Sequence, residues 1–235
     1  MGERRQLGAL TSNHLGGIEP CVIVALGSTE QHGPHLPLDT DTRIAAAVAG
    51  GLARQLPGRN LVAPAIPYGA SGEHQGFPGT ISIGTEALTT VLIEYGRSAC
   101  NWADRLVFVN GHGGNLDALR TAVRLLRAEG RDAGWCSCSV AGADAHAGHT
   151  ETSVLLHLSP EVVHIQDAAP GNTEPLADLL PRMRDGGVAA VSTSGVLGDP
   201  TTATATDGER IIADMVTDCV ARVQRWTPGP DGMLM

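Results

Sequence analysis

Aromatic residues are scarce in this chain, because Phe, Trp and Tyr together make up only 3% of its 235 residues. Glycine and proline are plentiful by contrast, with 30 and 14 residues. Large side chains are therefore few and backbone turns are many. We expect loops to build any functional site.

The sequence also has no run of about 18 apolar residues, the length that a membrane span requires, although 42% of its residues are hydrophobic. Its first stretch, MGERRQLGALTSNHLG, contains no apolar core long enough for a secretory signal. We therefore expect a soluble protein with no membrane partner and a cytoplasmic location.

Basic residues are outnumbered, and the net charge of −9 comes without a long acidic run. This balance is typical of a solubilising surface and argues against nucleic acid as a partner. The five cysteines are an odd number, and only Cys136 and Cys138 are close in sequence. This pair could suit a metal or a disulfide, but small buried thiols are commoner. We interpret the cysteines as structural thiols in a reducing compartment.

Short apolar runs alternate with longer stretches of helical periodicity, which is typical of parallel strands joined by crossover helices. Each run is almost entirely apolar, as expected for strands that are covered on both faces. The pattern predicts an α/β fold in a single domain over residues 1–235. The predicted strands are 21–26, 61–66, 105–110 and 134–140.

Helices are predicted between these strands and at the end of the chain, at about 41–56, 86–103, 116–129, 150–158 and 209–226. Asp39, Thr40 and Asp41 are available as caps for the first helix. The stretch from about 170 to 206 breaks the alternation with glycines and runs of Ser and Thr. We expect it to be an active-site or interface loop.

The strongest local signal is GSTEQHGPHLPLDTD, which directly follows the first predicted strand. Ligands bind at such strand ends in open α/β sheets. Carboxylates combined with imidazoles suit zinc, manganese or iron(II) better than calcium. For Asp39 we favour a solvated or capping role. Five potential ligands lie within twelve residues: Glu30, His32, His35, Asp39 and Asp41.

Two further signals contain histidine. In VNGHGGN, glycines on both sides of His112 permit close approach of the backbone to an ion or ligand, whereas an isolated histidine is usually structural. In DAHAGHTETS, His146, His149 and Glu151 lead into an apolar helix. Glu151 alone is weak evidence, because a carboxylate near a helix N-terminus also interacts favourably with the helix dipole.

Together these motifs resemble the creatininase (creatinine amidohydrolase) family. The resemblance also covers EHQGFPGTISI at 73–83 and GVLGDPTTAT at 195–204, so it extends from about residue 22 to 225 in the same order. It implies an αβα sandwich with a largely parallel sheet and a homo-oligomer, often a hexamer. It further implies hydrolysis of C–N bonds in cyclic or linear amides at a centre of two divalent metal ions.

Residue by residue, the resemblance makes Asp41 the carboxylate that bridges both ions. It places Glu30 and His112 on one ion and His32 on the other. It assigns proton transfer to His146, with His149 as the alternative. Such a metal pair lowers the pKa of a shared water toward neutrality and polarises the scissile carbonyl.

The chain departs from true creatinine amidohydrolases at one position, where Gly114 replaces a metal-binding glutamate. The resemblance to members that share GHGGN makes Glu151 the fifth ligand instead. This substitution argues against creatinine as the substrate. The length and the EQHGPHLPLDTDT motif are most similar to members that trim a precursor peptide. A cyclic-amide or formamide hydrolase is the alternative, and a non-catalytic metal-binding scaffold is a further one.

Overall fold

The computed structural model describes residues 5–235. Its centre is a four-stranded sheet in the order β2-β1-β3-β4, and every neighbouring pair is parallel. This confirms the predicted α/β class with a parallel sheet. The strands are β1 (Cys21–Leu26), β2 (Asn60–Val62), β3 (Arg105–Asn110) and β4 (Ala133–Ser137).

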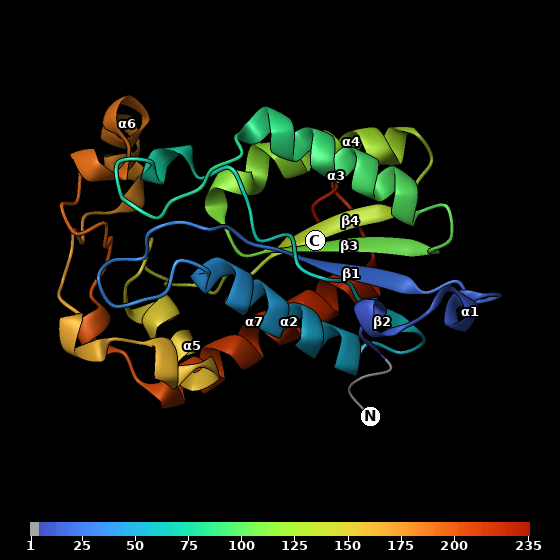
Figure 1. The fold of residues 1–235 in the computed structure, drawn as a ribbon, viewed down its shortest axis with the longest axis horizontal. Helices are drawn as coiled ribbons and strands as arrows, with labels where there is room; N and C mark the ends of the chain where they lie inside the picture. The colour runs from blue at the N-terminus through green and yellow to red at the C-terminus, as the bar shows by residue number, and fades with distance from the viewer. Residues whose placement is uncertain (1–4) are drawn as a thin grey trace.

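Helices cover both faces of this sheet, as the ribbon in Figure 1 shows. Helices α3 and α4 pack together on one face, whereas α2, α5 and α7 lie on the other. The helices are α1 (Ser12–Leu15), α2 (Thr40–Gln55), α3 (Thr85–Ala99), α4 (Leu116–Ala128), α5 (His149–Leu158), α6 (Leu176–Gly186) and α7 (Ala205–Arg225). Among residues 5–235, none of these helices has the length and apolarity to cross a bilayer.

Alternating residues of each strand enter two separate cores. Val22 and Val24 belong to the core beneath α3 and α4, whereas Ile23 and Ala25 belong to the core beneath α2 and α7. Successive side chains of a strand point to opposite faces. Because both faces are covered, the strands show no alternation of polar and apolar residues in the sequence.

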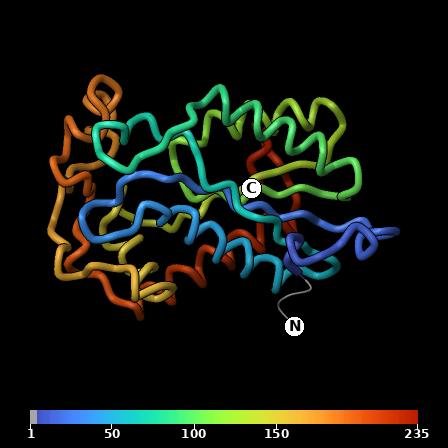
Figure 2. Tube along the Cα trace, viewed as in Figure 1, coloured from blue at the N-terminus to red at the C-terminus, as the bar shows by residue number. Residues whose placement is uncertain are grey.

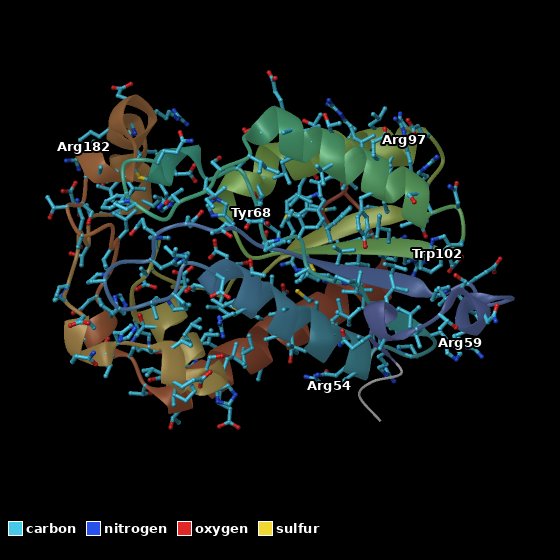
Figure 3. All side chains as sticks on the ribbon, in the orientation of Figure 1. Arg54, Arg59, Tyr68, Arg97, Trp102 and Arg182 are labelled. Carbon is cyan, nitrogen blue, oxygen red and sulfur yellow. The ribbon has the colours of Figure 1, made fainter. Side chains whose placement is uncertain are left out.

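The carboxyl ends of the parallel strands lie at one end of the molecule. Figure 2 shows the segments that follow β1 and β2 at this end, together with the segment at 170–204. Figure 3 places Arg182 of α6 at the same end, and Arg59 and Trp102 at the opposite end. Arg59 directly precedes β2 and Trp102 shortly precedes β3, so they mark the amino ends of the strands.

Several predicted boundaries were wrong. The strands predicted at 61–66 and 134–140 end at Val62 and Ser137, and the helix predicted to reach 103 ends at Ala99. The last helix begins at Ala205, where the Thr204 hydroxyl accepts a hydrogen bond from the backbone N–H of Asp207. A cap from Thr therefore starts this helix earlier than the predicted position 209.

Residues 170–206 are more ordered than a loop, because they contain helix α6. Pro181 lies inside this helix and Gly186 ends it, and both residues oppose helix formation in an isolated chain. Burial of Leu179 beside Val188 and Leu197 stabilises the segment. Tertiary packing thus overrides the local signals. The five cysteines are all free thiols, and two of them, Cys136 and Cys219, are buried.

Candidate metal centre

The sequence-predicted site residues converge at the carboxyl ends of the strands. Each one lies in the segment after a strand or in the first turn of the next helix, so the parallel sheet brings together residues that are far apart in the chain. The residues are Glu30 and His32 after β1, Asp41 in the first turn of α2, His112 after β3, His146 after β4, and Glu151 in the first turn of α5.

Asp41 lies between two imidazoles. Its Oδ1 is 3.1 Å from Nε2 of His32, and its Oδ2 is 3.3 Å from Nδ1 of His112. The hydroxyl of Ser28 donates a hydrogen bond of 2.7 Å to Oδ2 and thereby fixes the carboxylate. The two oxygens of one buried carboxylate therefore face two different rings.

Glu30 is fully buried, and neither of its carboxylate oxygens has a hydrogen-bond partner. Burial raises the pKa of Glu30 to about 7. An unpaired buried carboxylate is strongly unfavourable, and pairing with a cation removes much of that cost. These two oxygens lie 3.3 Å from Nε2 of His74 and 3.2 Å from Nε2 of His112. The chemistry of this position therefore fits a bound metal ion.

Glu151 approaches the cluster from α5. Its Oε2 is 3.8 Å from Nε2 of His32 and accepts a hydrogen bond of 2.6 Å from the backbone N–H of Ala147. Burial raises the pKa of Glu151 to about 7. Ala147 has a positive φ of 51°, which costs energy for a residue other than glycine. Its bond to Glu151 helps to hold this strained turn next to His146.

The carboxylates also set the electrostatics of the histidines. Burial lowers the pKa of His32, but the neighbouring Asp41 outweighs burial and raises that pKa to about 10. Burial likewise opposes charge on His112, yet Glu30 and Asp41 raise its pKa well above the usual value. Both shifts report a strongly negative potential at the cluster, which favours a bound cation.

Hydrogen bonds to backbone carbonyls fix the proton positions of His32 and His112. Nδ1 of His32 lies 3.1 Å from the carbonyl oxygen of Glu30, and Nε2 of His112 lies 3.3 Å from that of Ala70. A carbonyl oxygen can only accept, so each of these ring nitrogens carries the proton. When a ring is neutral, as a metal ligand must be, its other nitrogen therefore directs a lone pair toward Asp41.

His146 has the same arrangement. Its Nε2 donates a hydrogen bond of 2.8 Å to the carbonyl oxygen of Gln31, which leaves a lone pair on Nδ1. This Nδ1 is 3.9 Å from Oε1 of Glu30. Burial, followed by the neighbouring His32 and His74, lowers the pKa of His146 well below the usual range, so the ring is neutral at pH 7.

The described residues contain three groups that could each hold a metal ion, and within each group the potential ligand atoms lie within 4.8 Å of one another. His112 belongs to none of these groups, although it contacts both Asp41 and Glu30. Carboxylate oxygens together with imidazole nitrogens suit transition metals. The groups are Glu30–His32–Asp41, His32–His146–Glu151 and Glu30–His74–His146.

The structure separates His35, Asp39 and His149 from this cluster. His35 pairs through Nε2 with the hydroxyl of Thr152 at 2.9 Å, and Asp39 forms an ion pair with Arg43. Asp39 thus has a surface role, as favoured from the sequence, but its side chain forms no capping hydrogen bond to the helix. The ring of His149 contacts Thr202 on the surface and is 34% exposed.

His74 and Gln31 are site residues that the sequence reasoning missed. His74 lies in the short helix η3 (Gly72–His74) and stacks against His146 with ring centroids 4.4 Å apart. Gln31 contacts both of these rings. The motif EHQGFPGTISI at 73–83 carries a signal for His74, but the ten residues 63–72 separate it from the end of β2, so its position in the sequence does not mark it as a strand-end site.

A pocket of about 280 Å³ opens onto the cluster. Its walls include Asp41, His112, His146 and Glu151, together with the segment 143–145. A larger hollow of about 900 Å³ lies near Arg59 and His14, at the amino ends of the strands. Of the residues that line this larger hollow, none is a carboxylate, so we place the chemistry in the smaller pocket.

Comparisons with known proteins agree with this arrangement. The Creatininase family model, described as creatinine amidohydrolase, matches residues 10–223. The chain is 67% identical over 236 residues to the mycofactocin precursor peptide peptidase of Mycobacterium ulcerans (strain Agy99), covering 97% of this chain and 94% of that one. It is 29% identical over 225 residues to the creatinine amidohydrolase of Pseudomonas putida, covering 82% and 84%.

Solved structures show the same fold. A structure titled "Crystal structure of creatinine amidohydrolase (creatininase)" has a TM-score of 0.78 and 26% identity, and the match covers 96% of this chain and 99% of that chain. The family match, together with the buried carboxylates and imidazoles at the strand ends, identifies a metal-dependent hydrolase. The chain belongs to the creatininase family.

Proposed function

We propose that this chain is a metal-dependent peptidase that hydrolyses a C–N amide bond in the mycofactocin precursor peptide. The observation that carries this proposal is 65–67% identity, over 97% of the chain, to relatives named mycofactocin precursor peptide peptidase. Identity to the creatinine amidohydrolase is 29% over 82% of the chain. The substrate class therefore follows the more similar group.

The proposed cofactor is a pair of divalent ions of zinc, iron or manganese, with Asp41 binding both. Glu30 and His112 would hold one ion, and His32 and Glu151 the other. This division is supported by the two oxygens of Asp41, because one faces His32 and the other faces His112. When bound, the ions supply an activated water and polarise the scissile carbonyl.

His146 is the proposed proton-transfer residue, and the atom that acts is Nδ1. Its Nε2 is occupied by the carbonyl of Gln31, so a proton can enter and leave the ring only at Nδ1. A neutral imidazole can accept a proton during attack on the carbonyl and then deliver it to the leaving nitrogen. An amine leaves a tetrahedral intermediate readily only after it has gained this proton.

Gly114 supports a substrate other than creatinine. A Cβ atom at this position would lie 2.3 Å from the carbonyl oxygen of Ala70 and 2.4 Å from Nε2 of His112. The backbone here therefore leaves no room for the glutamate that creatinine amidohydrolases carry in this motif. Different pocket walls around the same metals bind the transition states of different substrates with different affinity, and this difference determines which substrate is cleaved.

The test offers the metal-loaded enzyme three substrates, namely the modified precursor peptide, creatinine and a formamide, and compares kcat/KM. We expect clear cleavage of the peptide near its C-terminus and negligible creatinine turnover. Creatinine turnover equal to peptide turnover would overturn the substrate assignment. His146→Ala is the matched control, because it should keep its metals and lose about 10²–10⁴ in turnover. If fully metal-loaded protein cleaves none of the three substrates, the result would favour the alternative of a non-catalytic metal-binding scaffold.

We also propose that the protein acts in the cytoplasm as a homo-oligomer, with a hexamer as the expected size. The family resemblance supports this assembly. Light scattering coupled to size-exclusion chromatography tests it, because six chains of 24.3 kDa differ clearly in mass from one.

A further inference from the structure

The side-chain amide of Gln31 is held in one orientation. Its Oε1 accepts a hydrogen bond of 2.9 Å from the backbone N–H of Gly33, and its Nε2 lies 3.3 Å from the carbonyl oxygen of Gly195. The two contacts distinguish the oxygen from the nitrogen, because an N–H donates and a carbonyl oxygen accepts. The amide nitrogen therefore faces the histidines.

Glycine at position 195 makes this arrangement possible. A Cβ atom there would lie 1.9 Å from Oε1 of Gln31, and its φ of +83° disfavours other residues. Gly33 also has a positive φ, of +67°. The sharp turns at these two glycines bring backbone groups from distant parts of the chain onto one buried amide.

The amide nitrogen of Gln31 is 2.8 Å from Nδ1 of His74. An amide nitrogen carries hydrogens and has no lone pair to offer, so Nδ1 of His74 must be the acceptor. The neutral ring then carries its proton on Nε2, which lies 3.3 Å from Oε1 of Glu30. His74 thus presents an N–H to the cluster.

This orientation is the reverse of that in the other three histidines. His32, His112 and His146 each donate a proton outward to a backbone carbonyl, and in their neutral forms they direct a lone pair inward. The group Glu30–His74–His146 satisfies the distances for metal binding, but an N–H cannot ligate a metal. Gln31 acts on both rings, because its amide nitrogen is 2.8 Å from Nδ1 of His74 and 3.0 Å from Nε2 of His146. The backbone carbonyl of Gln31 lies at the shorter distance of 2.8 Å from that Nε2 and can only accept, so Nε2 of His146 carries the proton.

We propose that Gln31 is a positioning residue that keeps His74 out of the metal-ligand set, because it leaves an N–H rather than a lone pair on the side of the ring that faces Glu30. The N–H of His74 then lies 3.3 Å from one oxygen of Glu30, and the other oxygen lies beside His112. The role of Glu30 as a ligand rests on the proposed function, whereas the proton position on His74 can be measured without metal or substrate.

The primary experiment is long-range ¹H–¹⁵N NMR of metal-free protein labelled with ¹⁵N-histidine, with the His74 signals assigned from a His74→Asn variant. The expected spectrum shows a protonated Nε2 and an unprotonated Nδ1 in His74. Gln31→Glu places an acceptor beside Nδ1 and is expected to move the proton there. Gln75→Glu is the matched control, because Gln75 is exposed and directly follows His74 in the sequence. It should leave the His74 spectrum unchanged.

The second experiment measures zinc affinity by competition with a chelator in Gln31→Met, which removes the donor but keeps the side-chain length. Loss of an outer hydrogen-bonding partner typically weakens metal binding about 10- to 100-fold, and we expect a loss in this range. Unchanged His32 and His112 signals verify that the variant is folded.

A proton on Nδ1 of His74 in the unmodified protein, or zinc affinity in Gln31→Met equal to that of the unmodified protein, would overturn the proposal. Absence of peptide cleavage alongside the expected spectra would overturn only the proposed function.

Discussion

Substitution of Gly114 by alanine tests whether packing, rather than chain flexibility, requires glycine beside the metal centre. The added Cβ would lie 2.3 Å from the Ala70 carbonyl oxygen, 2.4 Å from Nε2 of His112 and 2.7 Å from Oε1 of Glu73. Backbone oxygen cannot move aside cheaply, so we take the upper part of the usual overpacking cost of about 1–3 kcal/mol. The gain of about 0.4–1 kcal/mol from a stiffer unfolded chain offsets part of it.

The net loss is expected to be about 1–2 kcal/mol, which lowers Tm by about 2–8 °C in a chain of this size. Urea unfolding of the metal-free protein measures it. Gly113→Ala is the matched control, because a Cβ there meets nothing within 4 Å; it should be neutral or slightly stabilising. Equal stability of the two variants would refute the reasoning. Gly114→Glu carries the same Cβ, so we expect it to lose stability rather than to gain creatinine turnover.

Four further predictions concern the cluster and its surroundings. Asp41→Ala should lose both ions, and full metal content by elemental analysis would contradict the bridging role. Glu151→Gln should lose one ion selectively, which the same measurement shows. His146→Ala should keep its metals and lose about 10²–10⁴ in turnover, as steady-state kinetics with the peptide would show. Burial, together with the charge of His32, lowers the pKa of His35 to about 4. The unfolded chain therefore takes up this proton first, and stability present above pH 6.5 is lost as the pH falls toward 4; metal-free His35→Gln should lose less stability over this range in urea titrations.

Much of the fold was predictable because the α/β arrangement repeats one local pattern. The runs at 21–26 and 105–110 are strands with these bounds, since uninterrupted apolar residues indicate burial on both faces. Helix α6 was not predictable, because Pro181 and the neighbouring glycines carry local signals against a helix. Its stability comes from contacts with residues such as Leu197, which no local pattern reveals.

The site was predictable where a motif directly follows a strand. Glu30, His32 and Asp41 lie within twelve residues of one another, so local spacing alone indicated a cluster. The contacts of Gln31 were not accessible in this way, because its partners His74 and Gly195 are 43 and 164 residues away. Only the folded structure shows that the side-chain amide of Gln31 contacts the rings of both His74 and His146.

Glu151, the proposed fifth ligand, shows why the position from which a carboxylate reaches the cluster matters as much as its chemistry. A carboxylate at position 114 would belong to the β3 side of the site, where the Ala70 carbonyl and the side chains of His112 and Glu73 already fill the space. Glu151 instead arrives from α5, through a turn at Ala147 that is strained by a positive φ. The segment 143–145 before this turn lines the pocket beside the cluster. If Glu151 is the fifth ligand, as proposed, the same turn that places this carboxylate also places a wall of the pocket, so changes in this turn should affect metal binding and substrate choice together.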